Sequence, residues 1–189
     1  MERLPIFAII AIVVPPCAAD VIGASWNQFL LPSGFPTAVE ATVASISGKP
    51  YAFFYPQGIY SSEDGMSWTY QASPFGGNDS PESVFQIGNV LYALGVATVW
   101  RSANPIADWS EVARADAFPG YDASHAAYAV LDEHLFVIGG YWLGPSPGKS
   151  GPVFESTDGA KWTNPVSDAP WGPREDHGVV TYNGRLWLM

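Results

Sequence analysis

Basic residues and cysteine are both scarce in this chain. It contains 8 Lys and Arg against 18 Asp and Glu, which gives a formal net charge of −10, and 1 cysteine in 189 residues. Proteins bind nucleic acid largely by displacing its condensed counterions with Lys and Arg. We therefore expect no nucleic acid partner and no attraction to an anionic membrane.

The first nineteen residues have the organisation of a secretory signal peptide. An apolar run covers Pro5–Val14, and small residues precede a cleavage point after Ala19. A transmembrane helix needs about 20 apolar residues, so this run is too short to be an anchor. An alternative is lipidation at Cys17, which Pro16 disfavours. We expect residues 1–19 to be removed and the protein to be secreted, into the periplasm if the host is bacterial, with no membrane partner after cleavage.

Residues 20–189 then contain no cysteine at all. This excludes a disulfide, a thiolate nucleophile and a Cys-ligated zinc or copper site, so stability must come from packing. Aromatic residues make up 14% of the chain, and it holds 19 Gly and 17 Pro. Such a composition is typical of many short strands joined by tight turns.

A repeat of about forty residues runs along the chain. Trp26, Trp68, Trp109 and Trp162 mark it, and each is followed within ten residues by a second aromatic side chain. A short apolar stretch comes later in each unit. These stretches are Pro50–Phe54, Leu91–Gly95, Leu135–Gly140 and Leu186–Met189.

Each unit carries the signals of two antiparallel hairpins. The first hairpin joins an alternating strand to the apolar stretch through a polar turn, such as Leu131–Glu133 or Asn183–Gly184. The second turns at Asp64–Gly65 or Asp158–Gly159, because Asp-Gly supplies the positive φ of a tight turn. The strands expected before the first turn are Val39–Ile46, Ser83–Ile87, His125–Val130 and His177–Tyr182.

Four short strands per repeat, without helical periodicity, predict an all-β fold. We expect a β-propeller of four-stranded antiparallel blades in residues 20–189. About three and a half blades are present, because the fourth unit stops at Met189. The chain is therefore expected to be the N-terminal part of a longer protein, or to close its ring by self-association.

The apolar strand Leu135–Gly140, which ends in Gly-Gly, and Trp162 resemble the kelch-type β-propeller family. Arg174 and His177, followed by Leu186–Leu188, are similar to the start of another such repeat. The resemblance implies a repeat architecture and does not specify an activity.

The second hairpins are similar to the Asp-box turns of sialidase-like propellers. The Asp-box pattern fits Ser61–Trp68 with Glu63 in place of the aspartate, and a spacing one residue shorter fits Ser62–Trp68 and Ser156–Trp162. Sialidases of that class hold a carboxylate with several converging arginines. Residues 20–189 contain few arginines, so we assign no catalytic residue here.

Candidate site residues are few. The repeated tryptophans are expected to pack between blades. Tyr141 and Trp142 open the inserted Gly- and Pro-rich segment, outside the repeat pattern, and are the predicted ligand-binding residues. Asn78 lies in Asn-Asp-Ser, a possible glycosylation acceptor in a eukaryotic host.

The three histidines are assigned structural roles. His125 and His177 occupy equivalent positions of the expected repeat, and His134 lies in a turn. No metal-binding or serine-hydrolase motif accompanies them, so no metal and no cofactor is expected.

Two functions are consistent with these observations. The preferred one is a secreted, non-catalytic binding module that recognises glycan or protein through loops such as Tyr141–Gly151. The alternative is a segment of a secreted glycan-active enzyme, sialidase-like or galactose-oxidase-like, whose catalytic residues lie beyond residue 189. A purely structural surface protein is not separated from the first by the sequence.

Overall fold

The computed structural model describes residues 40–55, 58–65, 67–72, 74–75, 81–113, 118, 121–142 and 151–189. These residues form fourteen strands and no helix, which confirms the predicted all-β class. Accordingly, no helix in this part of the chain is long and apolar enough to cross a membrane. The expected leader (residues 1–19), Trp26 and Asn78 lie outside the described residues.

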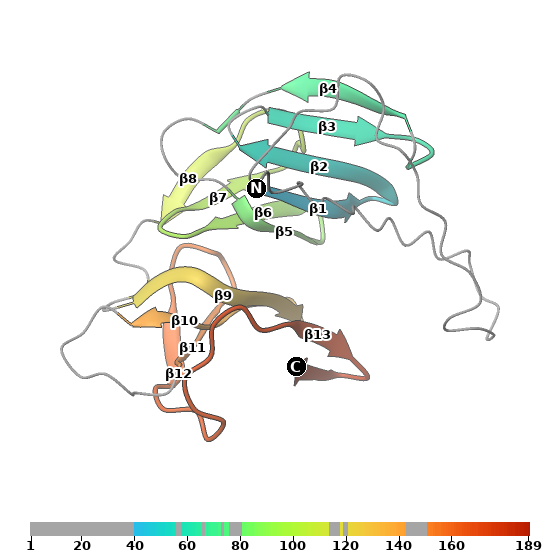
Figure 1. The fold of residues 1–189 in the computed structure, drawn as a ribbon. Helices are drawn as coiled ribbons and strands as arrows, with labels where there is room; N and C mark the ends of the chain where they lie inside the picture. The colour runs from blue at the N-terminus through green and yellow to red at the C-terminus, as the bar shows by residue number, and fades with distance from the viewer. Residues whose placement is uncertain are drawn as a thin grey trace, which may run out of the picture.

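The strands form three four-stranded antiparallel sheets and one hairpin, each in chain order (Figure 1). Sheet I contains β1 (Glu40–Ile46), β2 (Lys49–Tyr55), β3 (Gly58–Ser62) and β4 (Trp68–Ala72). Sheet II contains β5 (Pro81–Ile87), β6 (Val90–Gly95), β7 (Val99–Ser102) and β8 (Ser110–Ala113). Sheet III contains β9 (Tyr121–Leu131), β10 (His134–Trp142), β11 (Val153–Ser156) and β12 (Thr163–Val166). Sheet IV contains β13 (Val179–Tyr182) and β14 (Arg185–Leu188).

Two-residue turns close the first hairpin of every sheet. In sheet IV, Asn183 and Gly184 have φ values of 52° and 66°, as a tight hairpin turn requires. In sheet III, Asp132 and Glu133 adopt φ values of 49° and 63°. Leu131 is therefore the last residue of β9 and pairs with His134, whereas the sequence placed Leu131 in the turn.

Sheet II is buried on both faces because side chains alternate along its strands. Leu91 and Ala93 point to one side of β6 and join a core shared with sheet I. Tyr92 and Leu94 point to the other side and join a core shared with sheet III. The sheets are therefore stacked face to face, in the order in which they occur along the chain (Figure 1).

The first strands of neighbouring sheets lie side by side. β1 contacts β5, and β9 contacts β13. The Ser47 backbone N–H donates to Gln86 Oε1 over 2.8 Å between sheets I and II. The Thr181 hydroxyl donates to the Val130 carbonyl over 2.7 Å between sheets IV and III. Polar contacts therefore join sheets I and II, and sheets III and IV, at the edges formed by their first strands, and apolar contacts join sheet II to both of its neighbours.

Sheet IV leaves one apolar face uncovered. Val180 and Trp187 are paired across its two strands and are both exposed, as is Tyr182. The opposite face contributes Leu186 and Leu188, which are partly buried. The two-stranded sheet thus ends the described stack with an exposed apolar surface.

Candidate functional site

The hairpin between β3 and β4 is braced by three of its own side chains. Ser62 Oγ accepts the Gly65 N–H over 2.8 Å and donates to Asp64 Oδ1 over 3.0 Å. The same carboxylate oxygen accepts the Ser67 N–H over 2.7 Å. The Trp68 indole N–H donates to the Gly65 carbonyl over 3.3 Å. These bonds involve Ser62 rather than Ser61, so the shorter of the two spacings describes this turn.

Sheet III repeats this hairpin between β11 and β12. Ser156 Oγ accepts the Gly159 N–H over 2.9 Å, and the Trp162 indole N–H donates to the Gly159 carbonyl over 2.9 Å. Asp158 Oδ1 accepts the Lys161 N–H over 2.8 Å. The backbone N–H of Lys161 is the main reason that the pKa of Asp158 lies below its ordinary value.

Sheet II reaches a similar arrangement with a longer turn. Ser102 Oγ accepts the Asn104 N–H over 2.9 Å, and Asn104 Oδ1 accepts the Ile106 N–H over 3.0 Å. The Trp109 indole N–H donates to the Pro105 carbonyl over 3.1 Å. A serine, an Asx residue and a tryptophan therefore brace the second hairpin of each four-stranded sheet.

Two of the four repeated tryptophans, Trp109 and Trp162, pack between sheets, as the sequence predicted for them; Trp26 lies outside the described residues, and Trp68 joins neither core cluster. Trp109 lies 5.1 Å from Phe75 between ring centroids, and both pack on the core between sheets I and II. Trp162 lies 5.0 Å from Phe118 against the core between sheets II and III. In these two cases the second aromatic of one unit thus contacts the tryptophan of the next.

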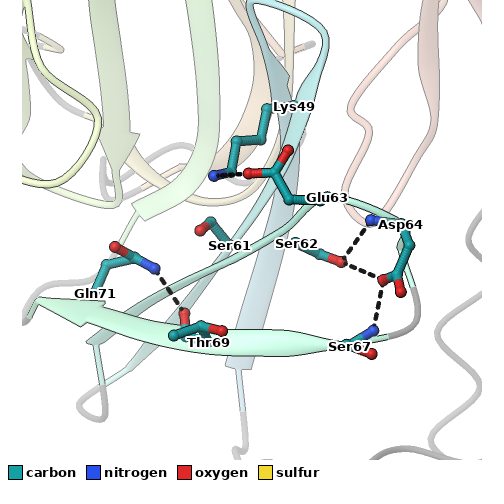
Figure 2. Close-up of a pocket in the computed structure, with 8 residues that line it drawn as sticks. All are labelled: Lys49, Ser61, Ser62, Glu63, Asp64, Ser67, Thr69 and Gln71. Atoms are coloured by element: carbon teal, nitrogen blue, oxygen red, sulfur yellow. Dashed lines mark hydrogen bonds and ion pairs between the residues drawn. The ribbon is translucent and has the colours of Figure 1, made fainter.

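A polar hollow of about 270 Å³ opens on sheet I beside its braced hairpin (Figure 2). Its side chains come from β2, β3, β4 and the β3–β4 turn. They are Lys49, Ser61, Ser62, Glu63, Asp64, Ser67, Thr69 and Gln71. The sequence reasoning did not identify this site.

The strand register explains why these polar groups meet. Tyr51 pairs with Ser61, and Ser61 pairs with Thr69, so the three side chains share one face of the sheet. Lys49 lies two residues before Tyr51 on that face and forms an ion pair with Glu63, with 2.5 Å between Nζ and Oε1. Further along the same face, strand positions carry core residues, so the hollow is the polar corner of a core-forming surface.

Lys49 and Glu63 neutralise each other at the hollow, and Asp64 adds one negative charge on the side of the turn. The hydrogen bond to Glu63 raises the pKa of Lys49, so the ammonium stays protonated at neutral pH. The Lys49 side chain is 35% exposed and that of Glu63 is 83% exposed, so their attraction is screened by water. The pair contributes hydrogen-bonding groups without a net charge.

Tyr141 and Trp142 lie elsewhere, in sheet III. Both belong to β10, where their backbones pair with Asp122 and Tyr121 beyond a register shift between Gly139 and Tyr141. The strand thus continues through residues that the sequence assigned to the start of a loop. Tyr141 is 51% exposed, which leaves its ring accessible. The Trp142 side chain and residues 143–150 lie outside the described part of the structure.

The histidines have three different surroundings. His125 Nδ1 lies 2.7 Å from Asp176 Oδ1, and this hydrogen bond is the main cause of a raised pKa for His125. His134 pairs with Glu155 across β10 and β11. The two ring nitrogens of His177 are buried without a hydrogen-bond partner among the described residues, and burial lowers the pKa of His177.

His125 and His177 are therefore not structural equivalents, and this expectation was wrong. His125 and Asp176 precede Leu131 and Tyr182, the last residues of β9 and β13, by the same number of positions. Both adopt a positive φ, of 61° and 53°. Because Leu131 belongs to β9 and not to the turn, the true correspondence is shifted by one residue.

Within the described residues, no group of three or more His, Cys, Asp or Glu side chains gathers in a way that could hold a metal ion. The chain matches no protein-family model, and no curated protein sequence matches it.

Proposed function

We propose that this chain is a secreted, non-catalytic binding module whose sheets are consecutive blades of a kelch-type β-propeller. The propeller is supported by the face-to-face stacking of sheets I to III and by the adjacent first strands β1–β5 and β9–β13. The exposed face of sheet IV fits a further blade, or a second copy that completes the ring. Secretion rests on residues 1–19 alone.

The observation that carries a binding role is the 51% exposed side chain of Tyr141 at the end of β10, in a sheet whose second hairpin is braced by its own side chains. Ser62, Ser102 and Ser156 each fix a turn whose tryptophan is held by an indole hydrogen bond. A rigid scaffold of this kind holds exposed side chains in place before a ligand arrives, which lowers the entropy cost of binding. Tyr141, exposed at the end of β10, and its neighbour Trp142 are the proposed ligand contacts, for a glycan or a protein.

Ligand capture tests this proposal. The immobilised full chain is presented with a glycan panel and an extracellular protein panel, beside the variant Tyr141→Ala/Trp142→Ala. We expect saturable capture from one panel and at least tenfold weaker capture by the variant, since buried aromatic contacts dominate many interfaces. Equal capture by the variant would reject the assignment of these two residues.

The same preparation is assayed for turnover of glycosides and sugar alcohols. Turnover would support a glycan-active enzyme in place of a non-catalytic module. Failure to capture anything from either panel would remove the binding role itself.

A further inference from the structure

The polar corner of sheet I lies on a sheet face that otherwise carries buried apolar side chains. On this face the Phe53–Ile59 pair belongs to the buried core, and the next pair along the strands is Tyr51–Ser61. Ser61 is only 4% exposed, yet it carries a hydroxyl where the neighbouring pair carries apolar groups. Thr69 and Gln71 continue the polar character on β4. A core-facing position filled with polar groups needs hydrogen-bonding partners.

The intramolecular bonds of the hollow leave hydrogen-bonding capacity unused. Gln71 Nε2 donates to the Thr69 carbonyl over 3.2 Å, and this bond does not involve the side-chain oxygen of Gln71. Lys49 gives one of its three ammonium hydrogens to Glu63. In Figure 2, Ser61 lies between this ion pair and Gln71, with the groups directed toward a common space. The hollow therefore offers both donors and acceptors to a ligand.

The hydrogen bonds that hold the hollow rigid lie within the β3–β4 turn and leave Lys49, Ser61 and Gln71 available to a ligand. Asp64 Oδ1 is occupied by Ser62 and by the Ser67 N–H, so Asp64 serves the turn. This turn fixes β3 against β4, which positions Ser61 beside Thr69. Ligand binding would then order few additional side chains, and the entropy cost falls mainly on Lys49 and Gln71.

The chemistry of these groups selects a ligand class. Sugar hydroxyls both donate and accept hydrogen bonds, so they match a set that contains an ammonium, a carboxylate, hydroxyls and an amide. The Lys49–Glu63 pair adds no net charge, and the chain carries −10 overall, which disfavours an anion. The volume of about 270 Å³ lies near the lower end of small-molecule pockets and suits a single sugar ring.

We infer that this hollow on sheet I is a binding site for one neutral saccharide unit, in addition to the site proposed at Tyr141 and Trp142. Glu63 accepts a hydrogen bond from a ring hydroxyl, the Thr69 hydroxyl donates to or accepts from another, and Lys49 donates to a further oxygen. The site is open and has no aromatic side chain in its lining, so affinity for a single sugar is in the millimolar range.

Backbone NMR shifts of the isotope-labelled full chain test this inference. Methyl glucoside, methyl galactoside and methyl mannoside are the neutral probes, and glucuronic acid is the charged comparator. We expect saturable shifts at Ser61, Thr69 and Gln71 with at least one neutral sugar, and weaker shifts with the acid. Shifts confined to other regions, or none at any accessible sugar concentration, would overturn the inference.

Two substitutions separate hydrogen bonding from folding. Glu63→Gln keeps the shape of the side chain but removes its charge, and Thr69→Val removes one hydroxyl. Each should weaken the saccharide association by about tenfold, because hydrogen bonds to charged or well-placed groups are lost. Lys161→Met, an exposed lysine of the equivalent hairpin in sheet III, is the matched control and should bind as the parent does. Parent-like binding by both hollow variants would reject the site.

This outcome is separable from that of the proposed function. If Tyr141→Ala/Trp142→Ala loses ligand capture while the hollow shows no sugar-dependent shifts, the saccharide site fails and the binding module stands. If the hollow binds sugar and the chain also turns over a glycoside, the saccharide site stands and the non-catalytic role fails.

Discussion

His125 Nδ1 and Asp176 Oδ1 lie 2.7 Å apart, at corresponding positions of two adjacent sheets. The Asp176 backbone N–H also donates to the His125 carbonyl over 3.0 Å. Both residues adopt a positive φ, which places each at an irregular point near the start of its hairpin. The same structural position is thus used twice, and its two copies bond to each other to join sheet IV to sheet III.

This contact should stabilise the protein most at acidic to neutral pH. The Asp176 hydrogen bond raises the pKa of His125 above 6.5, with smaller contributions from Glu175 and Glu82. The stabilisation is fully present below pH 6.5, the unfolded value, and is lost as the pH rises through the raised pKa. NMR titration of His125 should show the raised value. Asparagine tolerates the positive φ of this position, so His125→Asn should fold. In this variant the decrease in stability at alkaline pH should disappear.

His177 should produce the opposite pH dependence. Burial lowers the pKa of His177, and Arg174 lowers it further. The unfolded chain takes up a proton as the pH falls below 6.5 while the folded chain resists, so stability decreases until the lowered pKa is passed. Thermal unfolding from pH 7 to pH 4 measures this decrease.

His177→Leu should remove that acid-dependent loss. At neutral pH the variant should be about 1 kcal/mol more stable, because the ring nitrogens of His177 have no partner in the described part of the chain and a buried, unpaired polar group is costly. An unchanged pH profile in His177→Leu would show that another group controls the acid side. His134→Gln is the comparison variant, since His134 is paired with Glu155.

Strand pattern and turn chemistry were sufficient to predict an all-β chain of four-stranded antiparallel sheets, whereas the candidate site depends on the strand register. Asn183–Gly184 and Asp158–Gly159 have strong local turn preferences, so a hairpin was predicted correctly at each. The turn at Asp158 is longer than the tight turn predicted, because β11 ends at Ser156 and β12 begins at Thr163, and only Gly159 of the Asp-Gly pair has a positive φ. Leu131 was misplaced because its apolar side chain carries no signal that distinguishes a strand end from a turn. That error of one residue produced the false equivalence of His125 and His177.

The hollow on sheet I was missed for a similar reason. Ser61 and Thr69 are adjacent only because β3 and β4 pair in one register, and a bulge beside Ile59 and Tyr60 shifts that register within the strand. A one-residue slip would have moved these hydroxyls to the opposite face. A signal was present in Lys49, Ser61 and Glu63, which place polar groups on the strand face that also forms the core.

The indole hydrogen bond of the braced hairpin should contribute measurably to the free energy of unfolding. Trp162→Phe keeps an aromatic ring against Phe118 but loses the donor to the Gly159 carbonyl. We expect a loss of about 1 to 2 kcal/mol in chemical denaturation, from one hydrogen bond and the smaller ring. Ser156→Ala should cost a similar amount, since Ser156 is buried and accepts the Gly159 N–H. A change below about 0.5 kcal/mol in both variants would indicate that packing alone holds the turn.

Gly58 should tolerate no side chain, in contrast to Gly48. Gly58 has φ +114°, and an added Cβ would lie 2.3 Å from the carbonyl oxygen of Ala72 on β4. Gly48 also has a positive φ, of +79°, but nothing lies within 4 Å of the added atom. Gly48→Ala should therefore cost about 1 kcal/mol of backbone strain. Gly58→Ala combines such strain with a backbone clash, and should cost more than about 3 kcal/mol or prevent folding. Because the two glycines flank β2 in sheet I, equal losses in chemical denaturation would mean that β3 and β4 are not closely paired at Gly58.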